Sequence, residues 1–333
     1  MEQGGRDGEL LEGKFAWERN AGFQGDGKDR TTPADKLNET MISHAREIAD
    51  EIGATVILVY ADVIRSRKIL ESLTGDDRCI LAARTDEAAH DLSEMEGIGG
   101  RVVRVPSVEL STLSQIKVAS ILALSSGLIR SEDRLVCLSG SRRRGMLDSL
   151  RVVDVGREFE IFSAGSRGIT KRMSYPHVFD RLLTLTLEFA DEGKEGRPIG
   201  TIFVLGEHEK VMELSAQMTL NPFNGVPEED RNLLNPSLKE TIREFATIDG
   251  AFVIRDDGVI LSAGRHLKAS AEEANLPQGL GARHRAAAGI TALTDAIAIV
   301  ISQSTGEVRV FSGGKIFLEI EKETRERKYK ARE

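Results

Sequence analysis

Hydrophobic and polar positions follow two different periods along this chain. From Asp35 onward, segments with one period alternate with segments that have the other. Apolar residues spaced three to four positions apart predict amphipathic helices, whereas short apolar runs bounded by turn residues predict buried strands. In the first half, helical segments separate the strand runs "ATVILVYA", "CILAART", "RVVRVP" and "RLVCLSG". Strands that alternate with helices are typical of an α/β domain with a mostly parallel sheet.

The second half combines helices with a hairpin signal. "HVFDRLLTLTLEFADEG" and "EHEKVMELSAQM" have helical spacing, and so does "SLKETIREFATI", where Ser237 and Glu240 stand at the separation of a capping box. The runs "AFVI" and "VILSA" flank Asp257-Gly258, which is a strong signal for a tight β-turn. We therefore expect a second α/β domain, with a mixed sheet flanked by helices.

Polar, glycine-containing segments divide the chain. Residues 1–35 are rich in glycine and charge with little periodicity, which predicts a mobile tail. "SAGSRGITKRMS", residues 163–174, is typical of a linker, and residues 321–333 of a solvated charged tail. The two predicted domains are accordingly residues 36–162 and 175–320.

Length and charge narrow the class of protein. A chain of 333 residues suggests two domains, and a net charge of −8 argues against a general nucleic-acid binder, although a local basic cluster can still bind an anionic small ligand. Cys79 and Cys137 lie in apolar runs and predict buried thiols rather than a zinc or disulfide framework. No run approaches the length of a membrane span and no signal-peptide pattern occurs, so we expect a cytoplasmic protein without membrane contact.

The hairpin begins with an unusual triplet, Asp249-Gly250-Ala251. A hairpin does not need a carboxylate followed by the two smallest residues, whereas a site that brings a bulky anionic ligand against the backbone does. Taken alone, however, this triplet is more often a turn at a strand entry.

A second motif, "GLGARHRAAA", covers residues 279–288. Gly279 and Gly281 precede a predicted helix, whose free N–H groups and dipole favour an anion. Arg283, His284 and Arg285 add charge and donors suited to phosphate. Alone, this triplet is more often a solvated helix face, and the glycines match neither a dinucleotide-binding fingerprint nor a Walker A loop.

In combination the motifs are more specific. "REFATIDGAFVI", the hairpin, "LPQGLGARHRAAAGI" and "IVISQSTGEV", with "GTIFVLG" and "LNPFNG" upstream, resemble the diadenylate cyclase domain. That family joins two ATP molecules into cyclic di-AMP, and its two signature motifs are Asp-Gly-Ala and Arg-His-Arg. The resemblance spans roughly residues 175–320.

The resemblance implies roles for the charged residues. A ribose 3′-hydroxyl must attack an α-phosphorus and expel pyrophosphate, which depends mostly on positioning and charge neutralisation. Asp249 is implied to bind a divalent cation, Mg²⁺ or Mn²⁺, and to help activate the hydroxyl. Arg283 and His284 are implied to hold the triphosphate, and Arg285 to support the same loop.

Further nucleotide contacts implied by the resemblance are Gly250, Ala251, Leu267, Gly281, Ala282 and Ser302. For Ser302 and Leu267, a strand-end hydroxyl and a core leucine remain open alternatives. Ala282 stands where many members have threonine, and Gln303 and Ser304 stand where the family often has two glutamates, so a second acidic metal ligand is in doubt. Because a cyclic dinucleotide needs two reciprocal attacks, the resemblance also implies a homo-oligomer in which two active sites face each other.

The first domain resembles the carboxy-terminal domain of pyruvate kinase through "ADEIGATVILVYADVI" and "CILAART". This combination of domains looks like the archaeal diadenylate cyclases. The arginines of "LSGSRRRG", residues 138–145, are either a plain basic loop or a site for an anionic effector.

Two rival functions remain at this point. One is a nucleotide sensor that has lost turnover, against which the intact Asp249 and Arg283-His284-Arg285 argue. The other is a DNA-binding scaffold, against which the acidic balance argues.

Overall fold

The computed structural model describes residues 31–158, 175–269 and 279–322. They form two compact units. The first comprises the chain up to Arg104 together with Leu135–Val152, and the second comprises Val105–Arg134 and the chain after Val152. The predicted linker and most of both predicted tails lie outside the described residues.

Helix α2 (Pro33–Ile52) begins inside the segment predicted as a tail. Thr32 Oγ1 accepts a hydrogen bond from the Asp35 backbone N–H at 3.1 Å, and the Asp35 carboxylate accepts one from the Thr32 N–H at 2.9 Å. This capping box, with Pro33 in the first turn, starts the helix before its first apolar position. Gly53 ends the helix in the left-handed region, at φ 65°.

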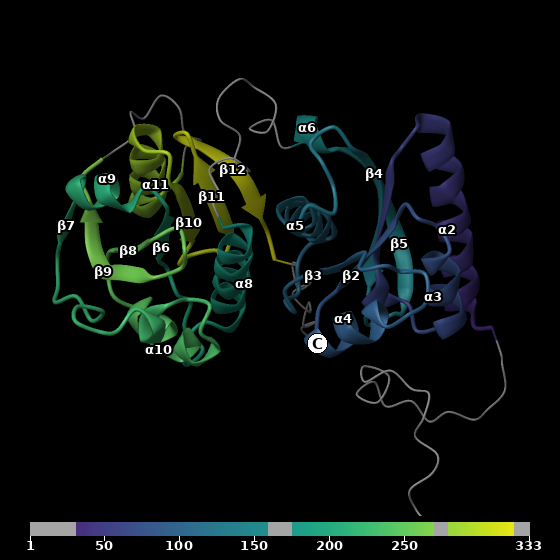
Figure 1. The fold of residues 1–333 in the computed structure, drawn as a ribbon, viewed down its shortest axis with the longest axis horizontal. Helices are drawn as coiled ribbons and strands as arrows, with labels where there is room; N and C mark the ends of the chain where they lie inside the picture. Colours follow the sequence, from purple (N-terminus) through teal and green to yellow (C-terminus); the bar gives the residue numbers. More distant parts are fainter. Residues whose placement is uncertain (1–30, 159–174, 270–278, 323–333) are drawn as a thin grey trace, which may run out of the picture. The chain divides into compact units, whose positions relative to one another are not determined.

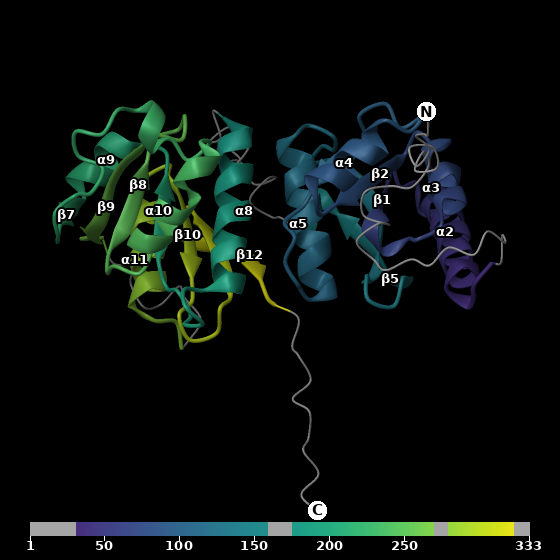
Figure 2. The same cartoon turned by 90° about the horizontal axis from the view of Figure 1, so that it is seen from below.

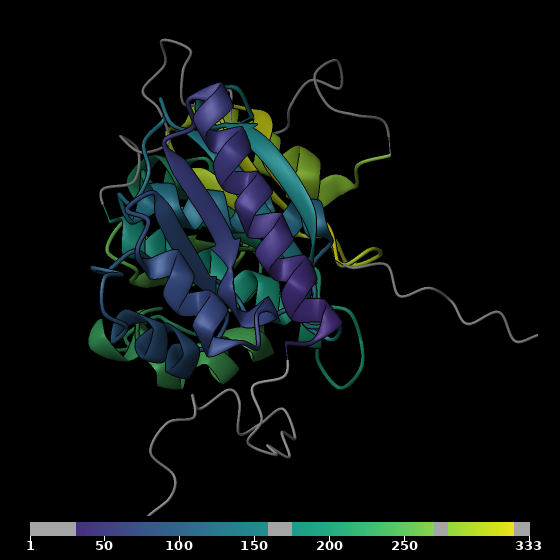
Figure 3. The same ribbon diagram turned by 90° about the vertical axis from the view of Figure 1, so that its right-hand side faces the viewer.

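The first unit contains a five-stranded sheet in the order β3-β2-β1-β4-β5. Its strands are β1 (Val56–Tyr60), β2 (Cys79–Ala83), β3 (Val102–Arg104), β4 (Arg134–Ser141) and β5 (Met146–Asp154). Strand β1 pairs in parallel with β2 and β4, and β2 with β3, which confirms the predicted parallel sheet. Helix α2 lies across one face (Figure 3), and α3 (Arg67–Thr74), α4 (Asp86–Ser93) and the 3₁₀ turn η1 (Ala61–Val63) belong to the same unit. Both cysteines are buried and free, as predicted.

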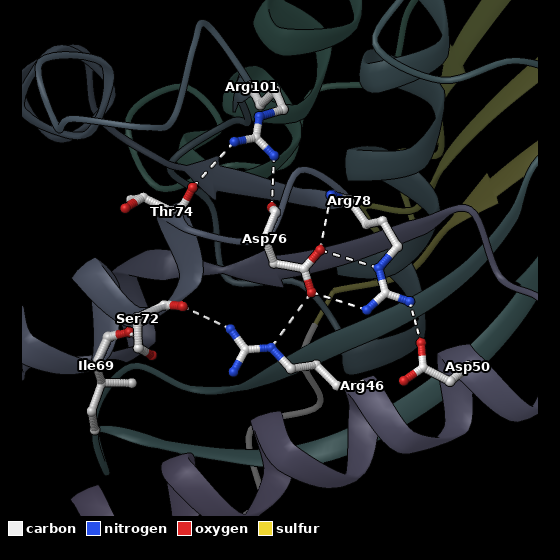
Figure 4. Close-up of polar contacts among 8 residues, drawn as sticks. All are labelled: Arg46, Asp50, Ile69, Ser72, Thr74, Asp76, Arg78 and Arg101. Atoms are coloured by element: carbon white, nitrogen blue, oxygen red, sulfur yellow. Dashed lines mark hydrogen bonds and ion pairs between the residues drawn. The ribbon is translucent and has the colours of Figure 1, made fainter.

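A closed charge network lies at the start of β2 (Figure 4). The Asp76 carboxylate accepts hydrogen bonds from the backbone N–H and the guanidinium of Arg78, each at 3.1 Å, and forms an ion pair with Arg46 at 3.5 Å. Arg78 also donates to Asp50 at 2.6 Å, while Arg101 donates to the Asp76 carbonyl at 2.6 Å. The hydrogen bonds from Arg78 lower the pKa of Asp76.

The second unit contains a seven-stranded sheet in the order β12-β11-β10-β6-β8-β9-β7. Its strands are β6 (Ile202–Leu205), β7 (Ser215–Gln217), β8 (Ala251–Ile254), β9 (Ile260–Leu267), β10 (Ile297–Ile301), β11 (Val308–Ser312) and β12 (Lys315–Ile320). Strands β6 and β8 are parallel, whereas the other pairs are antiparallel, so the predicted mixed sheet and the hairpin β8–β9 are confirmed.

Helices α8 and α11 lie on opposite faces of this sheet (Figures 1 and 2). The helical elements of the unit are α5 (Thr112–Ser125), α6 (Val155–Glu158), α8 (Pro176–Glu192), α9 (His208–Glu213), η3 (Glu229–Arg231), η4 (Pro236–Leu238), α10 (Lys239–Phe245) and α11 (Ala282–Leu293). Helix α5 packs on α8 and β12, where Ser125 Oγ donates to the Asp180 carboxylate at 2.5 Å. Of the described helices, none has the length and apolar character needed to cross a bilayer.

Two local predictions in this unit were wrong. Asn235, not Ser237, caps the turn before α10, because its side chain accepts from the Ser237 N–H at 3.1 Å. The helix predicted through "EHEKVMELSAQM" ends at Glu213, and β7 follows it. Pairing of Ser215 with Leu267 at the edge of the sheet overrides the helical spacing there.

Helix α11 can lie close to the sheet because its inner face is made of small residues. Ala287 and Ala288 are fully buried against Val204, Val253 and Val300 of the central strands. Close packing of this kind fixes the first turn of α11 near the ends of β8 and β10, and so positions the cavity described next.

Candidate active site

A cavity of about 760 Å³ opens in the second unit. Its walls include residues 249–250 before β8, 265–267 at the end of β9, 279–284 at the start of α11 and 301–305 after β10. Small-molecule sites have volumes of roughly 300–1,000 Å³, so a nucleotide fits this space. The fold thus brings the two sequence motifs, separated along the chain, to one cavity.

Asp249 lies at the entrance to β8, the strand that pairs in parallel with β6. Its side chain is 82% exposed, and its Oδ1 accepts a hydrogen bond from Arg283 Nη2 at 2.9 Å. An ion pair this exposed contributes little to stability. Each side chain can therefore give up this ion pair and bind a ligand at a small cost in free energy.

The backbone conformation at position 250 requires a glycine, whether or not a ligand is bound. Its φ is +113°, and a Cβ on it would lie 2.6–2.7 Å from backbone atoms of Gly264 and Arg265 in β9. Only glycine fits such a position. Ala251, the third residue of the motif, is fully buried in the core under α11 and does not line the cavity.

The start of α11 offers an open backbone. Gly281 is the N-cap with φ −74°, a conformation any residue adopts, and a Cβ on it would meet nothing within 4 Å. The first N–H groups of a helix have no partner within the helix, and they carry the positive end of its dipole. Ala282 and Gly281 both line the cavity, so an anion can reach these groups unhindered.

The two arginines of the second motif have different positions. Arg283 lines the cavity and bridges two walls, because Nη1 also donates to Gln303 Oε1 at 3.3 Å. Arg285 is exposed, does not line the cavity, and donates to the Leu280 carbonyl at 2.9 Å. Of these two arginines, only Arg283 lines the cavity, whereas Arg285 closes the glycine-rich turn.

His284 is buried, which corrects the expectation that all three side chains of this motif add positive charge. Burial, and next the positive charge of Arg309, lower its pKa to about 4. The ring lines the cavity and packs near Phe311, with centroids 6.1 Å apart. At neutral pH it is an uncharged imidazole.

Ser302 and Leu267 both line the cavity from buried positions at strand ends. Ser302 Oγ lies 3.3 Å from Ser304 Oγ. Gln303 and Ser304 have neutral side chains, at positions where glutamates would be expected from the sequence resemblance. The acidic side chains of this wall come instead from Glu307 and Glu319.

Sequence reasoning missed the part of the cavity made by β11 and β12. Arg309 lines the cavity with Glu307 and Glu319, and its guanidinium donates to both carboxylates at 2.6 Å. The signal was available in "EVRVF", where charged and apolar residues alternate. Alternation places Glu307 and Arg309 on one face of the strand, and antiparallel pairing places Glu319 opposite Arg309.

The site fits a divalent cation with few protein ligands. No group of three or more His, Cys, Asp or Glu side chains able to hold a metal occurs among the described residues. Mg²⁺, however, is usually bound through one or two carboxylates, with phosphate oxygens and waters completing its shell. Asp249, exposed at the cavity, is a suitable carboxylate for that arrangement.

The relatives of the chain decide its family. The family model described as "DisA bacterial checkpoint controller nucleotide-binding" matches residues 189–316. "Diadenylate cyclase" of Methanocaldococcus jannaschii is 31% identical over 299 residues, which cover 84% of this chain and 95% of that protein. This chain belongs to the diadenylate cyclase family. A second diadenylate cyclase, from Haloferax volcanii, is 37% identical over 60% of this chain and 72% of its own length.

The first unit has a separate match. Residues 37–162 match a family model described as "Probable sensor domain DacZ_P". The resemblance to the pyruvate kinase domain stays a prediction, because this description differs from it. Among solved structures, a double mutant of DacA from Staphylococcus aureus is similar at 24% identity and a TM-score of 0.28, over 43% of this diadenylate cyclase and 85% of that chain.

Proposed function

We propose that this protein condenses two ATP molecules into cyclic di-AMP with release of two pyrophosphates, and that two copies pair so that their cavities face each other. The observation that carries the proposal is the meeting of Asp249 and Arg283 in one cavity of nucleotide size, at 2.9 Å. The carboxylate and the guanidinium, which bind each other in this structure, would bind opposite ends of the substrate in the complex.

The triphosphate binds at the start of α11. The open N–H groups at Gly281 and Ala282 and the guanidinium of Arg283 neutralise its charge, which also stabilises the leaving pyrophosphate. Leu267 offers an apolar surface for the base, and Ser302 adds a hydroxyl to the cavity wall. The nucleotide is thereby oriented for in-line attack at the α-phosphorus.

Asp249 binds the hydroxyl group that attacks the phosphorus. Once Arg283 turns to phosphate, the Asp249 carboxylate is free to accept a hydrogen bond from the 3′-hydroxyl of the ribose held by the second copy, and so orients that oxygen. A divalent cation, Mg²⁺ or Mn²⁺, would be held by Asp249 and by phosphate oxygens, and when bound it neutralises phosphate charge. Two reciprocal attacks across a two-fold axis close the ring.

The test is direct turnover. The full chain, incubated with ATP and Mg²⁺ or Mn²⁺, should yield pyrophosphate and a cyclic dinucleotide in a two-to-one ratio. The rate per protomer should rise with protein concentration until pairing is complete. Asp249→Asn should lower the rate by about 100-fold or more with unchanged melting temperature.

The matched control is Asp257→Asn. Asp257 also binds an arginine, Arg255, at 2.7 Å, but it lies at the hairpin turn and does not line the cavity. Its variant should keep full turnover. Nucleotide binding without pyrophosphate release would instead identify a sensor, and an active Asp249→Asn variant would refute the role given to that carboxylate.

A further inference from the structure

Glu307, Arg309 and Glu319 are charged residues that line the cavity together with His284 of α11. The function proposed above gives them no role. Arg309 in β11 has a side chain only 13% exposed, and both carboxylates that flank it, Glu307 and Glu319, accept from it at 2.6 Å. Its remaining terminal nitrogen, Nη1, lies 3.3 Å from Nε2 of His284. The guanidinium is thus fixed on two sides and directed at the imidazole from the third.

The contact decides which nitrogen of His284 carries the proton. A guanidinium is always protonated and can only donate, so a hydrogen bond to Nε2 requires a lone pair there. An imidazolium has no lone pair on either nitrogen, so a charged ring cannot accept this bond. The neutral form with its proton on Nδ1 is the one state that satisfies the geometry.

We infer that Arg309 is a positioning residue, which holds His284 as a neutral imidazole with Nε2 occupied and Nδ1–H available to donate to the nucleotide. No described residue accepts a hydrogen bond from Nδ1, and the ring lines the cavity. His284 then acts as an uncharged donor to a phosphate oxygen. It cannot serve as the base for the 3′-hydroxyl, because its lone pair is already taken.

The charges around the ring agree with this assignment. Arg309 lies in β11, Glu307 just before that strand, Glu319 in β12 and Arg283 in the same helix as His284. Burial is the main cause that lowers the pKa of His284; the two arginines lower it further and the two glutamates raise it. Arg309, which contacts the ring, has a larger effect on this pKa than either carboxylate, and both carboxylates are paired with that same arginine. Removing Arg309 would therefore raise the pKa of His284, because it leaves two carboxylates without their partner and these favour a protonated ring.

The primary test needs no turnover, so it separates this inference from the proposed function. Nitrogen-15 NMR of the histidine rings in the full chain without ATP should show His284 as the Nδ1–H tautomer at pH 7, still uncharged at pH 5.5. The signal is assigned by its loss in His284→Asn, since the chain has six histidines. In Arg309→Met the ring should become protonated at clearly higher pH than in the wild type.

The activity arm uses the pH profile. In Arg309→Met the rate of cyclic dinucleotide formation should fall by about tenfold and gain a new acidic limb, absent from the wild type, as His284 charges. Arg309→Lys, which keeps a cationic donor, should restore much of the rate and remove that limb. A role limited to structure would change rate and stability together without moving the pH profile.

Arg255→Met is the matched control. Arg255 also binds two carboxylates, Glu228 and Asp257, in the same unit but away from the cavity. It should leave the tautomer and the pH profile of the wild type unchanged. An Nε2–H tautomer in the wild type, or an Arg309→Met variant whose His284 keeps its tautomer and its titration, would overturn the inference.

Discussion

Asp76 in the first unit and Asp249 in the second are both bound by arginine, but they differ in how many of their oxygen lone pairs the protein itself occupies. Asp76 in the first unit has a side chain 16% exposed, with its oxygens taken by Arg78 and Arg46. Asp249 in the second unit is 82% exposed, and among the described residues only Arg283 donates a hydrogen bond to its side chain. Both look like aspartates before a strand in the sequence.

The difference separates a structural charge from a functional one. Replacing a carboxylate that is saturated by the protein leaves buried donors without partners, which costs stability. An exposed carboxylate with spare lone pairs costs little to replace but can bind a ligand. The arginines follow the same division, because Arg78 has carboxylates on both sides, whereas Arg283 shares its donors between Asp249 and one neutral amide.

The largest effect on the open site is expected from the backbone beside it. Gly250→Ala forces a Cβ into the backbone of β9 at a positive φ, so we expect a loss of several kcal/mol in the free energy of unfolding, with displacement of Asp249 and loss of turnover. Denaturant unfolding and the cyclase rate measure the two effects. A stable, active Gly250→Ala variant would contradict the close approach of β8 and β9.

Gly281→Ala sharpens the same point. The position has an ordinary φ and empty space around it, so stability should change by less than about 1 kcal/mol. If the triphosphate approaches this backbone, the KM for ATP should nevertheless rise. Unchanged KM would show that the ligand stays away from the helix start.

The closed network predicts a stability effect with a specific pH dependence. Asp76→Asn should cost about 1–3 kcal/mol at pH 7, because donors of Arg78 and Arg46 lose a charged acceptor. The pKa of Asp76 is lowered in the fold, so its contribution is present above the unfolded value of about 4 and is lost as the pH falls further. The gap between wild type and variant should therefore narrow in acid.

The control for that experiment is the neighbouring residue. Asp77 is fully exposed at 103% and has one ion pair, with Arg101 at 3.5 Å. Asp77→Asn should match the wild type at every pH. A cost as large as that of Asp76→Asn would mean that saturation of a carboxylate does not decide its contribution.

A smaller effect than that of Asp76→Asn is expected at a carboxylate between the two extremes. Asp180 in α8 has one donor, Ser125, and burial raises its pKa to about 6. The folded state thus favours the protonated form; this contribution is complete below pH 4 and is lost as the pH rises through 6. Asp180→Asn should raise stability at pH 7.5 by on the order of 1 kcal/mol and should approach the wild type near pH 4.

Asp191→Asn, on the same helix, is the control, because Asp191 is more exposed and paired with Lys322 at 3.6 Å. It should show no gain at pH 7.5. If Asp180→Asn were less stable than the wild type at that pH, the carboxylate would have to be charged and paired.

Much of the fold could be predicted because it depends on local pattern. The parallel sheet of the first unit, the hairpin at Gly258 and the cap at Gly53 were all visible as period, turn residues and a helix stop. The error at β7 arose because a distant partner decided the outcome. Strand β7 exists because Ser215 pairs with Leu267, and no window around residue 215 contains that information.

The site could be predicted in part for the same reason. Motif and resemblance indicated Asp249, Gly281 and Arg283, and the cavity contains them. They did not distinguish Arg283 from Arg285, which turns away to the Leu280 carbonyl. They also missed Arg309, whose partners lie on another strand and on a helix.

The sequence alone thus determined which chemical groups are present and the period that makes each segment a helix or a strand, because both depend on residues close along the chain. Only the tertiary structure decided which charges remain available. Burial makes His284 neutral, saturation makes Asp76 structural, and exposure leaves Asp249 open. Solvation and hydrogen-bond partners depend on what packs around a side chain in space, and those neighbours come from distant parts of the sequence.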